Sequence, residues 1–294
     1  MILEPLASQP ATRCVIFSHG LGDTAHGWVD TLRELQAQPR LSTTRFILPT
    51  APVRKVTING GMPCPAWYDI KSLSGKRDEE GECEGLEASA GALYELIGQA
   101  GVPPARVVLA GFSQGGALSL FAGLNFGGAG ASAAAVAAGG GGGAAAAAAA
   151  APLGGIAVLS GYLPMPSKVA ANPLVLAHTP IRFFHGDEDR VVPLSYAEDA
   201  HKRLTGARRA PPRAPTLPLR ARGRNHPIQP SRFSFPPYLR RPGGGERKVF
   251  GLRGACPRRN RRGIRGVCRL LGEHLRNQKN ARLSLSFLAN FSPV

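Results

Sequence analysis

Short apolar segments and longer segments of helical periodicity alternate along the first 206 residues of this 294-residue chain. Apolar runs of about five residues bounded by turn residues predict buried strands, and apolar positions recurring every three or four residues predict helices. The predicted strands are residues 14–18, 45–49, 107–110, 156–159 and 180–184, and the predicted helices are residues 28–35, 86–99, 116–124 and 194–204. This alternation predicts an α/β fold, with a mainly parallel sheet and helices on both of its faces.

The junction between the strand at 107–110 and the helix at 116–124 holds the pentapeptide Gly111-Phe112-Ser113-Gln114-Gly115. A Gly-x-Ser-x-Gly between a strand and a helix predicts a nucleophile elbow. In this turn the serine backbone is strained and its hydroxyl stands clear of the sheet. The two glycines remove side chains that would collide in so sharp a turn. Ser113 is therefore the candidate nucleophile.

A serine hydroxyl is a weak nucleophile at neutral pH, so the elbow requires a base and an acid that orients the base. In this architecture the acid and then the histidine follow the serine along the chain. The turn after the strand at 180–184 holds two aspartates, Asp187 and Asp189. We favour Asp189, because Gly186 permits the turn and an acid three residues later has room to swing back. The alternative is a solvated acidic turn with no catalytic role.

A glycine-bearing loop, residues 19–23, follows the predicted strand at 14–18. Such a loop can aim a backbone N–H at the carbonyl oxygen under attack, jointly with the N–H of Gln114. The alternative is an ordinary glycine turn.

Seven motifs, which include the elbow, the glycine loop and the acidic turn, occur in order between residues 12 and 206. They are His19-Gly20-Leu21-Gly22-Asp23-Thr24 with Trp28, Pro49-Thr50-Ala51-Pro52, Asn59-Gly60-Gly61-Met62, Pro65-Ala66-Trp67-Tyr68-Asp69-Ile70, Gly111-Phe112-Ser113-Gln114-Gly115-Gly116-Ala117, Leu159-Ser160-Gly161-Tyr162-Leu163-Pro164, and His185-Gly186-Asp187-x-Asp189-x-Val191-Val192-Pro193. Together they resemble the acyl-protein thioesterase family of α/β-hydrolases, also called the lysophospholipase and carboxylesterase family.

The resemblance implies an α/β-hydrolase fold and a cytosolic enzyme that uses neither a metal nor an organic cofactor. The implied substrates are thioesters or esters of medium to long acyl chains, on acylated proteins such as those with palmitoyl-cysteine or in small acyl esters. It implies Ser113 as the nucleophile, Asp189 as the acid, and Leu21 and Gln114 as the oxyanion donors. Trp67 lies on a loop that crowns the sheet, where it either lines a groove for the acyl chain or packs the loop.

The chain departs from this family at two places. Residues 127–151 form a Gly- and Ala-rich insertion, which we expect to be disordered or weakly helical. Residues 1–206 carry 15 Lys and Arg against 17 Asp and Glu, whereas residues 207–294 carry 21 against 2, so the C-terminal part accounts for the formal net charge of +17. We predict a hydrolase domain at 1–206, a disordered Pro- and Arg-rich segment at 207–246, and an irregular segment at 247–294 that partly replaces the family's last strand and helix.

Three interpretations of residues 207–294 stay open. The arginines suit contacts with nucleic-acid phosphates, or the segment is a solvated tail without a partner. It is alternatively a translation artefact, because GC-rich DNA read out of frame yields Arg, Pro, Gly and Ala. The segment has neither an aromatic stacking pattern nor a known nucleic-acid motif, so we expect no specific nucleic-acid binding.

The histidine that completes the triad is the least determined residue. A fragment like the family's Gly-Leu-Gly-His loop begins at residues 251–252, but Arg253 follows where glycine and then histidine are expected. Of the two histidines that follow residue 206, His226 lies 37 residues after Asp189, which is about the right separation, and His274 suits a closing helix. We take His226 as the candidate base. The alternative is a catalytically impaired or dead hydrolase fold that acts, if at all, as an interaction module.

The cysteine content and the apolar segments of the sequence indicate the cellular compartment in which the protein acts. Five cysteines, an odd number without C-x-x-C pairs, indicate neither a disulfide framework nor a zinc site, and reduced thiols indicate the cytoplasm. The sequence shows no signal-peptide pattern and no apolar stretch near the ~20 residues of a membrane-spanning helix. The sequence therefore predicts no membrane-spanning segment, and the one kind of membrane association left open is transient contact of the protein with a membrane surface. The sequence leaves the oligomeric state unset.

Overall fold

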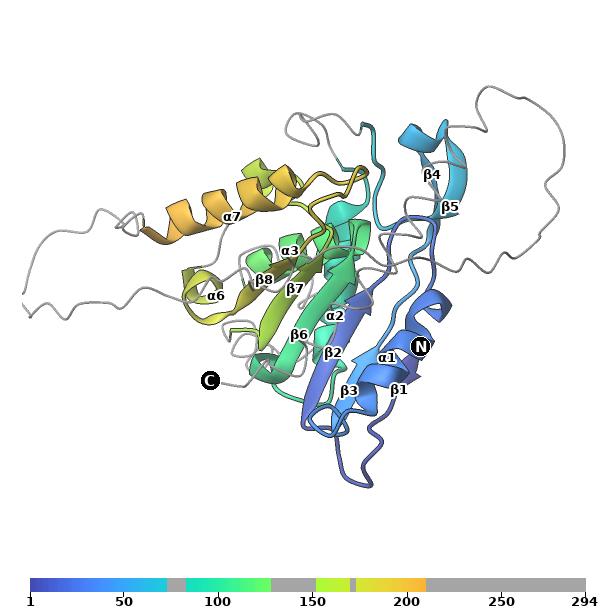
Figure 1. The fold of residues 1–294 in the computed structure, drawn as a ribbon, viewed down its shortest axis with the longest axis vertical. Coiled ribbons are helices and arrows are strands. Elements are labelled where there is room, and N and C mark those ends of the chain that lie inside the picture. Colours follow the sequence, from blue (N-terminus) through green and yellow to red (C-terminus); the bar gives the residue numbers. More distant parts are fainter. Residues whose placement is uncertain (73–82, 128–151, 170–172, 210–294) are drawn as a thin grey trace, which may run out of the picture.

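The computed structural model of the protein describes residues 1–72, 83–127, 152–169 and 173–209. These residues form a six-stranded sheet, a separate two-stranded sheet and surrounding helices (Figure 1). The strands are β1 (Ile2–Leu3), β2 (Arg13–Ser18), β3 (Thr44–Ile47), β4 (Val53–Val56), β5 (Met62–Pro65), β6 (Val107–Phe112), β7 (Gly155–Leu159) and β8 (Ile181–Phe184). The α-helices are α1 (His26–Gln36), α2 (Leu86–Gly98), α3 (Gln114–Asn125), α6 (Pro173–His178) and α7 (Leu194–Arg209).

The six-stranded sheet has the order β1-β3-β2-β6-β7-β8, and only the β1–β3 pair is antiparallel. From β2 the chain continues to β3 on one side and later to β6 on the other, so strand order reverses between β2 and β6. Open parallel sheets bind ligands outside the carboxyl ends of their strands at such a point. Ser18 pairs with Gly111, Phe112 with Leu159, and Leu159 with Phe184. The loops after β2, β6, β7 and β8 therefore leave the sheet together, at the carboxyl ends of these parallel strands.

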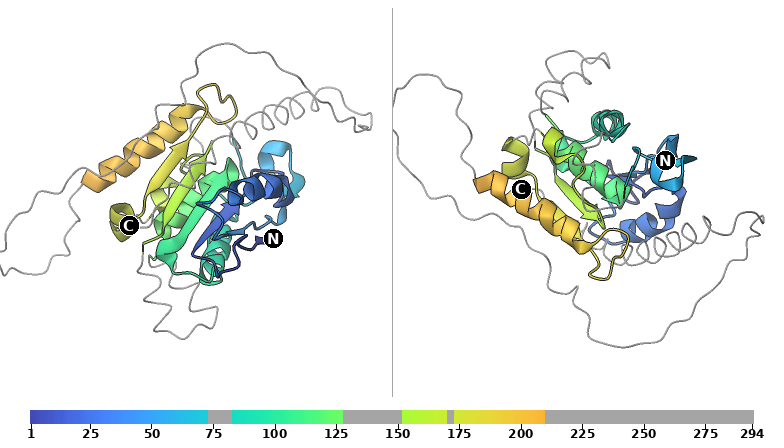
Figure 2. Two further views of the ribbon diagram at one scale, coloured as in Figure 1. Left: turned by 60° about the horizontal axis from the view of Figure 1, so that its bottom comes forward. Right: turned by 90° about the horizontal axis from the view of Figure 1, so that it is seen from above.

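Helices cover both faces of this sheet (Figure 2). Alternate strand residues face opposite sides, so Ile16 and Leu109 pack with Leu93 of α2, whereas Phe17 packs with Trp28 of α1. α6 and α7 share a third apolar cluster with α3, β7 and β8. The prediction of an α/β fold with a mainly parallel sheet and helices on both faces is confirmed.

All predicted strands and helices are present, with ends that differ by five residues or fewer. The sequence patterns did not predict β1, the β4–β5 hairpin or α6. Pro63 and Pro65 in β5 argue against a strand, and the hairpin turn depends on Gly60 and Gly61, whose φ values are 68° and 76°. The predicted Gly- and Ala-rich insertion, from residue 128, and the predicted C-terminal segments, from residue 210, lie outside the described residues.

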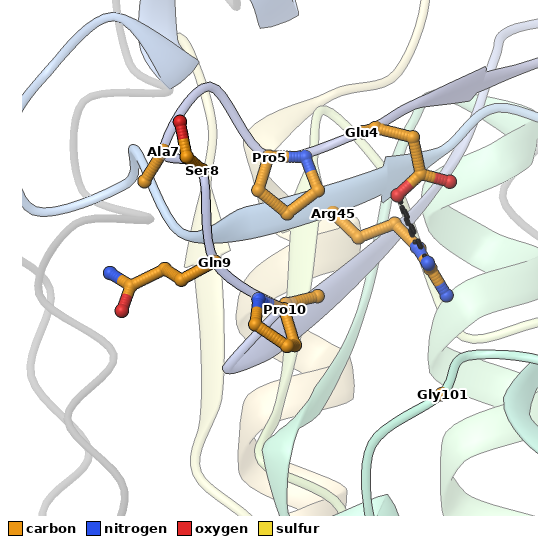
Figure 3. Close-up of a pocket in the computed structure, with 9 residues that line it drawn as sticks. Glu4, Pro5, Ala7, Ser8, Gln9, Pro10, Arg45 and Gly101 are labelled. Carbon is orange, nitrogen blue, oxygen red and sulfur yellow. Dashed lines mark hydrogen bonds and ion pairs between the residues drawn. The ribbon is translucent and has the colours of Figure 1, made fainter.

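A shallow pocket of about 380 Å³ lies against the N-terminal segment (Figure 3). Arg45 in its wall forms an ion pair with Glu4, with Nη2 and Oε2 2.9 Å apart, and donates from Nη1 to Ala100 O (3.1 Å). Arg45 pairs with Cys14 near the start of β2, so this pocket lies at the amino ends of the strands. Ser113 lies at the opposite edge. No helix in the described ranges has the length and apolarity needed to cross a membrane.

Candidate active site

Ser113 occupies a strained turn between β6 and α3. Its φ of 52° and ψ of −117° are rare for a residue with a side chain, and such a conformation raises the free energy of the folded state by about 1–3 kcal/mol. Hydrogen bonds on both sides hold it: Ser113 N–H donates to Leu159 O on β7 (2.8 Å), and Ser113 O accepts from Ala117 N–H (3.0 Å). The predicted elbow geometry is therefore present at Ser113.

The two elbow glycines are required by close backbone contacts. A side chain at Gly111 would overlap the backbone of Gly115, and one at Gly115 would overlap the carbonyl oxygens of Ser18 and His19. The second contact brings the start of α3 directly against the loop that follows β2. The elbow and the glycine loop at 19–23 are thus adjacent.

The predicted oxyanion donors lie on these two adjacent segments. Leu21 is partly buried in the loop, and Gln114 is the first residue of α3. Backbone N–H groups in the first turn of a helix have no acceptor within the helix. Within the described residues, neither the Leu21 N–H nor the Gln114 N–H has an acceptor. Both stay available to an oxyanion, although their role remains a prediction.

Asp23 and Trp28 fix the far end of the glycine loop. The Asp23 carboxylate accepts from Thr24 N–H at Oδ1 (2.7 Å) and from Trp28 Nε1 at Oδ2 (3.0 Å). The Trp28 ring is fully buried, with its centroid 4.6 Å from that of Phe17 and 5.4 Å from that of Phe112. Trp28 therefore joins the loop to the ends of β2 and β6, immediately before Ser113.

His19, which begins the loop, is a structural residue. Its Nε2 accepts from Ala51 N–H (3.0 Å), so its proton lies on Nδ1, which donates to Gly20 O (2.8 Å). Burial lowers the pKa of His19, and this favours the neutral ring that these two bonds require. His19 thereby supports the loop backbone next to Leu21.

Asp189 lies on the loop after β8, two strands away from β6. The turn is closed by a bond from Asp189 N–H to Gly186 O (3.3 Å), and Asp189 Oδ1 accepts from the N–H groups of Val191 and Val192 (both 2.9 Å). Its side chain is only 2% exposed, whereas Asp187 is exposed. A carboxylate held in this way can orient an imidazole, so the geometry suits Asp189 better than Asp187.

The candidate base, His226, lies outside the described residues, as does His274. The structure describes five other histidines. Of these, His26 and His178 are exposed, His201 is partly buried on α7, and His19 and His185 are buried. The base stays a prediction at His226.

Trp67 is buried between the two donor segments and is only 3% exposed. Its indole Nε1 donates to His19 O (2.8 Å), and its backbone N–H donates to Gln114 Oε1 (3.0 Å). This position agrees with the loop-packing alternative for Trp67. Substrate contact by Trp67 stays untested. These bonds join motifs that the sequence had singled out without indicating that they touch.

Within the described part of the chain, no group of three His, Cys, Asp or Glu side chains is placed to hold a metal ion. This finding does not test whether the reaction needs a metal or a cofactor, so the expectation that it needs neither stays a prediction.

Comparisons with known proteins decide the family. The sequence profile of a family described as phospholipase/carboxylesterase matches residues 5–141 and 139–210. The chain belongs to this family. Acyl-protein thioesterase 1 of Gibberella zeae is 37% identical to it over 215 residues, which cover 70% of this chain and 81% of that protein. Acyl-protein thioesterase 1 homolog 1 of Dictyostelium discoideum is 37% identical over 195 residues, covering 65% of this chain and 74% of that protein.

A solved structure agrees. The crystal structure of Zea mays acyl-protein thioesterase 2 is similar with a TM-score of 0.53 and 26% identity, covering 70% of this chain and 83% of that chain. The predicted resemblance and the α/β-hydrolase fold are confirmed. As a member of the phospholipase/carboxylesterase family, the chain is a serine hydrolase, and the family matches favour an active enzyme over the catalytically dead alternative.

Proposed function

We propose that this enzyme cleaves acyl thioesters on proteins through an acyl-Ser113 intermediate. The observation that carries the proposal is the strained Ser113 beside two backbone N–H groups, those of Leu21 and Gln114, that have no acceptor within the described residues. The names of the relatives support the acyl-protein substrate.

In the first half of the reaction, the Ser113 hydroxyl attacks the thioester carbonyl carbon while the base, which we place at His226, takes its proton. The negative charge that develops on the carbonyl oxygen is stabilised by the N–H groups of Leu21 and Gln114. The C–S bond then breaks, and the base returns the proton to the departing cysteine sulfur. Asp189 orients the imidazole and stabilises its positive charge.

In the second half, water attacks the acyl-serine ester. The same base removes a proton from the water, and the same two N–H groups stabilise the second oxyanion. The Ser113–acyl bond breaks, the serine regains its proton, and the fatty acid leaves. Apart from the substrate and water, the groups proposed for each step are side chains and backbone groups of the chain itself.

Hydrolysis of a peptide with a palmitoyl-cysteine thioester tests the function. The full-length protein should release palmitate and a free thiol, and Ser113→Ala should abolish the release. Ser119→Ala is the matched control, because Ser119 is a buried serine of α3 whose hydroxyl has no hydrogen-bond partner in the described structure. This variant should keep wild-type activity. Cleavage of only small oxygen esters, with the thioester untouched, would rule out the thioester proposal but not the esterase.

We also propose that the enzyme acts in the cytoplasm and meets its lipidated substrates at a membrane surface. Among the described cysteines, Cys14 and Cys64 are free thiols, and burial raises the pKa of Cys14 to about 12, which keeps it protonated and unreactive. Cell fractionation and co-sedimentation with lipid vesicles test the two parts. Recovery of the protein only from a secretory compartment would contradict the cytoplasmic location. Absence of binding to any lipid vesicle would contradict action at a membrane surface.

A further inference from the structure

Residues 65–68, which follow the β4–β5 hairpin, are hydrogen-bonded to the loop that holds Leu21. Gly22 N–H donates to Pro65 O (2.8 Å), and Trp67 Nε1 donates to His19 O (2.8 Å). These two bonds lie on either side of Leu21 along the chain. The peptide group of Leu21 is therefore held from both sides by one segment.

The same segment holds the residue that carries the second donor. The Gln114 side chain accepts from Trp67 N–H at Oε1 (3.0 Å) and donates from Nε2 to Tyr68 O (2.7 Å). The side chain of Gln114 is almost fully buried, and these bonds use its acceptor and one of its donors. Trp67 thus bonds through its ring to the loop of Leu21 and through its backbone to Gln114.

Trp67 is itself firmly placed. Its carbonyl oxygen accepts from the Ser89 hydroxyl on α2, and its ring centroid lies 5.0 Å from that of His19. The His19 ring is in turn bonded to Gly20 O and Ala51 N–H. A buried network in which each bond supports the next is rigid, since any displaced member leaves a buried polar group unsatisfied.

We propose that Trp67 is a positioning residue that fixes the spacing between the Leu21 and Gln114 N–H groups. The inference rests on the proposed function, because it assumes that these groups bind the oxyanion. Oxyanion donors act only when they lie about 2.7–3.1 Å from the developing charge, so two donors on separate loops need a rigid link. Trp67 supplies that link without touching the substrate. The alternative to this positioning role is that Trp67 lines the groove for the acyl chain.

Trp67→Phe in the full-length protein tests the proposal, because it removes the Nε1–H donor and keeps an aromatic ring beside His19. The kcat for p-nitrophenyl acetate, butyrate and octanoate should fall by about 10- to 100-fold, equally for all three esters, with KM unchanged. Affinity for a trifluoromethyl ketone, whose adduct with Ser113 carries the same oxyanion, should fall by the same factor as kcat/KM.

Two further variants separate positioning from general damage. Tyr94→Phe deletes a comparable hydrogen bond, from an aromatic side chain on α2 to Ala122 O (3.0 Å), and should leave kcat unchanged. Gln114→Met keeps the backbone donor but removes both side-chain bonds, so it should reproduce the Trp67→Phe kinetics. This second variant decides the question if Trp67→Phe fails to fold.

Two results would overturn the proposal. A KM that rises with acyl chain length in Trp67→Phe would place the indole in the acyl groove, and an unchanged kcat would show that the link has no catalytic role. Both outcomes leave the proposed function intact. The proposed function fails separately, if the wild-type protein hydrolyses these esters but releases no palmitate from the thioester.

Discussion

Asp189 and His185 lie side by side in the loop after β8. Asp189 Oδ2 is 3.7 Å from His185 Nε2, and the two side chains are 2% and 1% exposed. His185 Nε2 also lies 2.6 Å from Val192 O, which requires the ring proton on Nε2. Burial lowers the pKa of His185, which favours this neutral form. His185 therefore stabilises the acid-bearing loop.

Replacing Asp189 with asparagine should lower kcat for a thioester by about 10⁴-fold, because an amide no longer stabilises the imidazolium and favours the wrong tautomer of the base. The exposed Asp187 is the matched control, and Asp187→Asn should stay within about twofold of wild type. Steady-state kinetics of both variants check this. A larger loss in Asp187→Asn than in Asp189→Asn would exchange their roles.

The base is tested by His226→Ala and His274→Ala. If His226 takes the proton of Ser113, the first variant should lose about 10³-fold or more in kcat, leaving the residual rate that oxyanion donors and binding supply. His274→Ala should retain full activity. The opposite ranking would move the base to His274. Full activity in both variants would remove both histidines from the mechanism.

Close packing at the elbow predicts opposite effects of Gly→Ala at two helical positions. Gly115→Ala should lower the free energy of unfolding by about 1–3 kcal/mol and reduce kcat, because its Cβ would overlap two backbone carbonyls that cannot move aside cheaply. Gly91→Ala, in the middle of α2, has open space and should raise stability by about 0.5–1 kcal/mol. Urea unfolding measures both. A neutral Gly115→Ala would contradict the observed approach of α3 to the loop after β2.

Acid should destabilise the fold through His19 and His185. Burial lowers the pKa of both rings in the folded protein, so below the ordinary value of 6.5 the unfolded chain binds more protons than the folded one. The free energy of unfolding should therefore fall as the pH drops through 6.5, by up to about 1.4 kcal/mol per pH unit for each histidine, and this contribution should have nearly vanished by about pH 7.5.

Urea unfolding at about pH 7.5, 6 and 5 measures this dependence. His185→Asn should show a shallower slope than His178→Asn, because His178 is exposed on α6. Equal slopes in the two variants would exclude a contribution from His185.

The sequence predicted those parts of the fold whose signals are local. The apolar runs at β2, β6 and β7 are long enough to mark buried strands, and Gly111 and Gly115 around Ser113 specify the elbow. β1 has only two residues and exists because Ile2 and Leu3 pair with β3. The β4–β5 hairpin was not predicted because Pro63 and Pro65 lie in β5. Proline has no backbone N–H to donate to a neighbouring strand, so its presence argues against a strand.

The sequence indicated individual site residues better than their contacts. Ser113 and Asp189 follow strand ends, so topology brings their loops to one edge of the sheet. The sequence left two roles open for Trp67, which either lines the acyl groove or packs the loop. The choice between them depends on which distant segments contact the indole in the folded protein. Its bonds to His19 and Gln114 join segments about 50 residues apart along the chain. No local pattern carries that information.

Labelling with a fluorophosphonate tests the central claim, that Ser113 is an activated nucleophile, most directly. We expect the full-length wild-type protein to gain one covalent adduct by intact mass, and peptide mapping to place it on Ser113. Ser113→Ala should stay unlabelled, while Ser119→Ala should label like wild type. A folded wild-type protein that remains unlabelled, or an adduct on any other residue, would contradict the account.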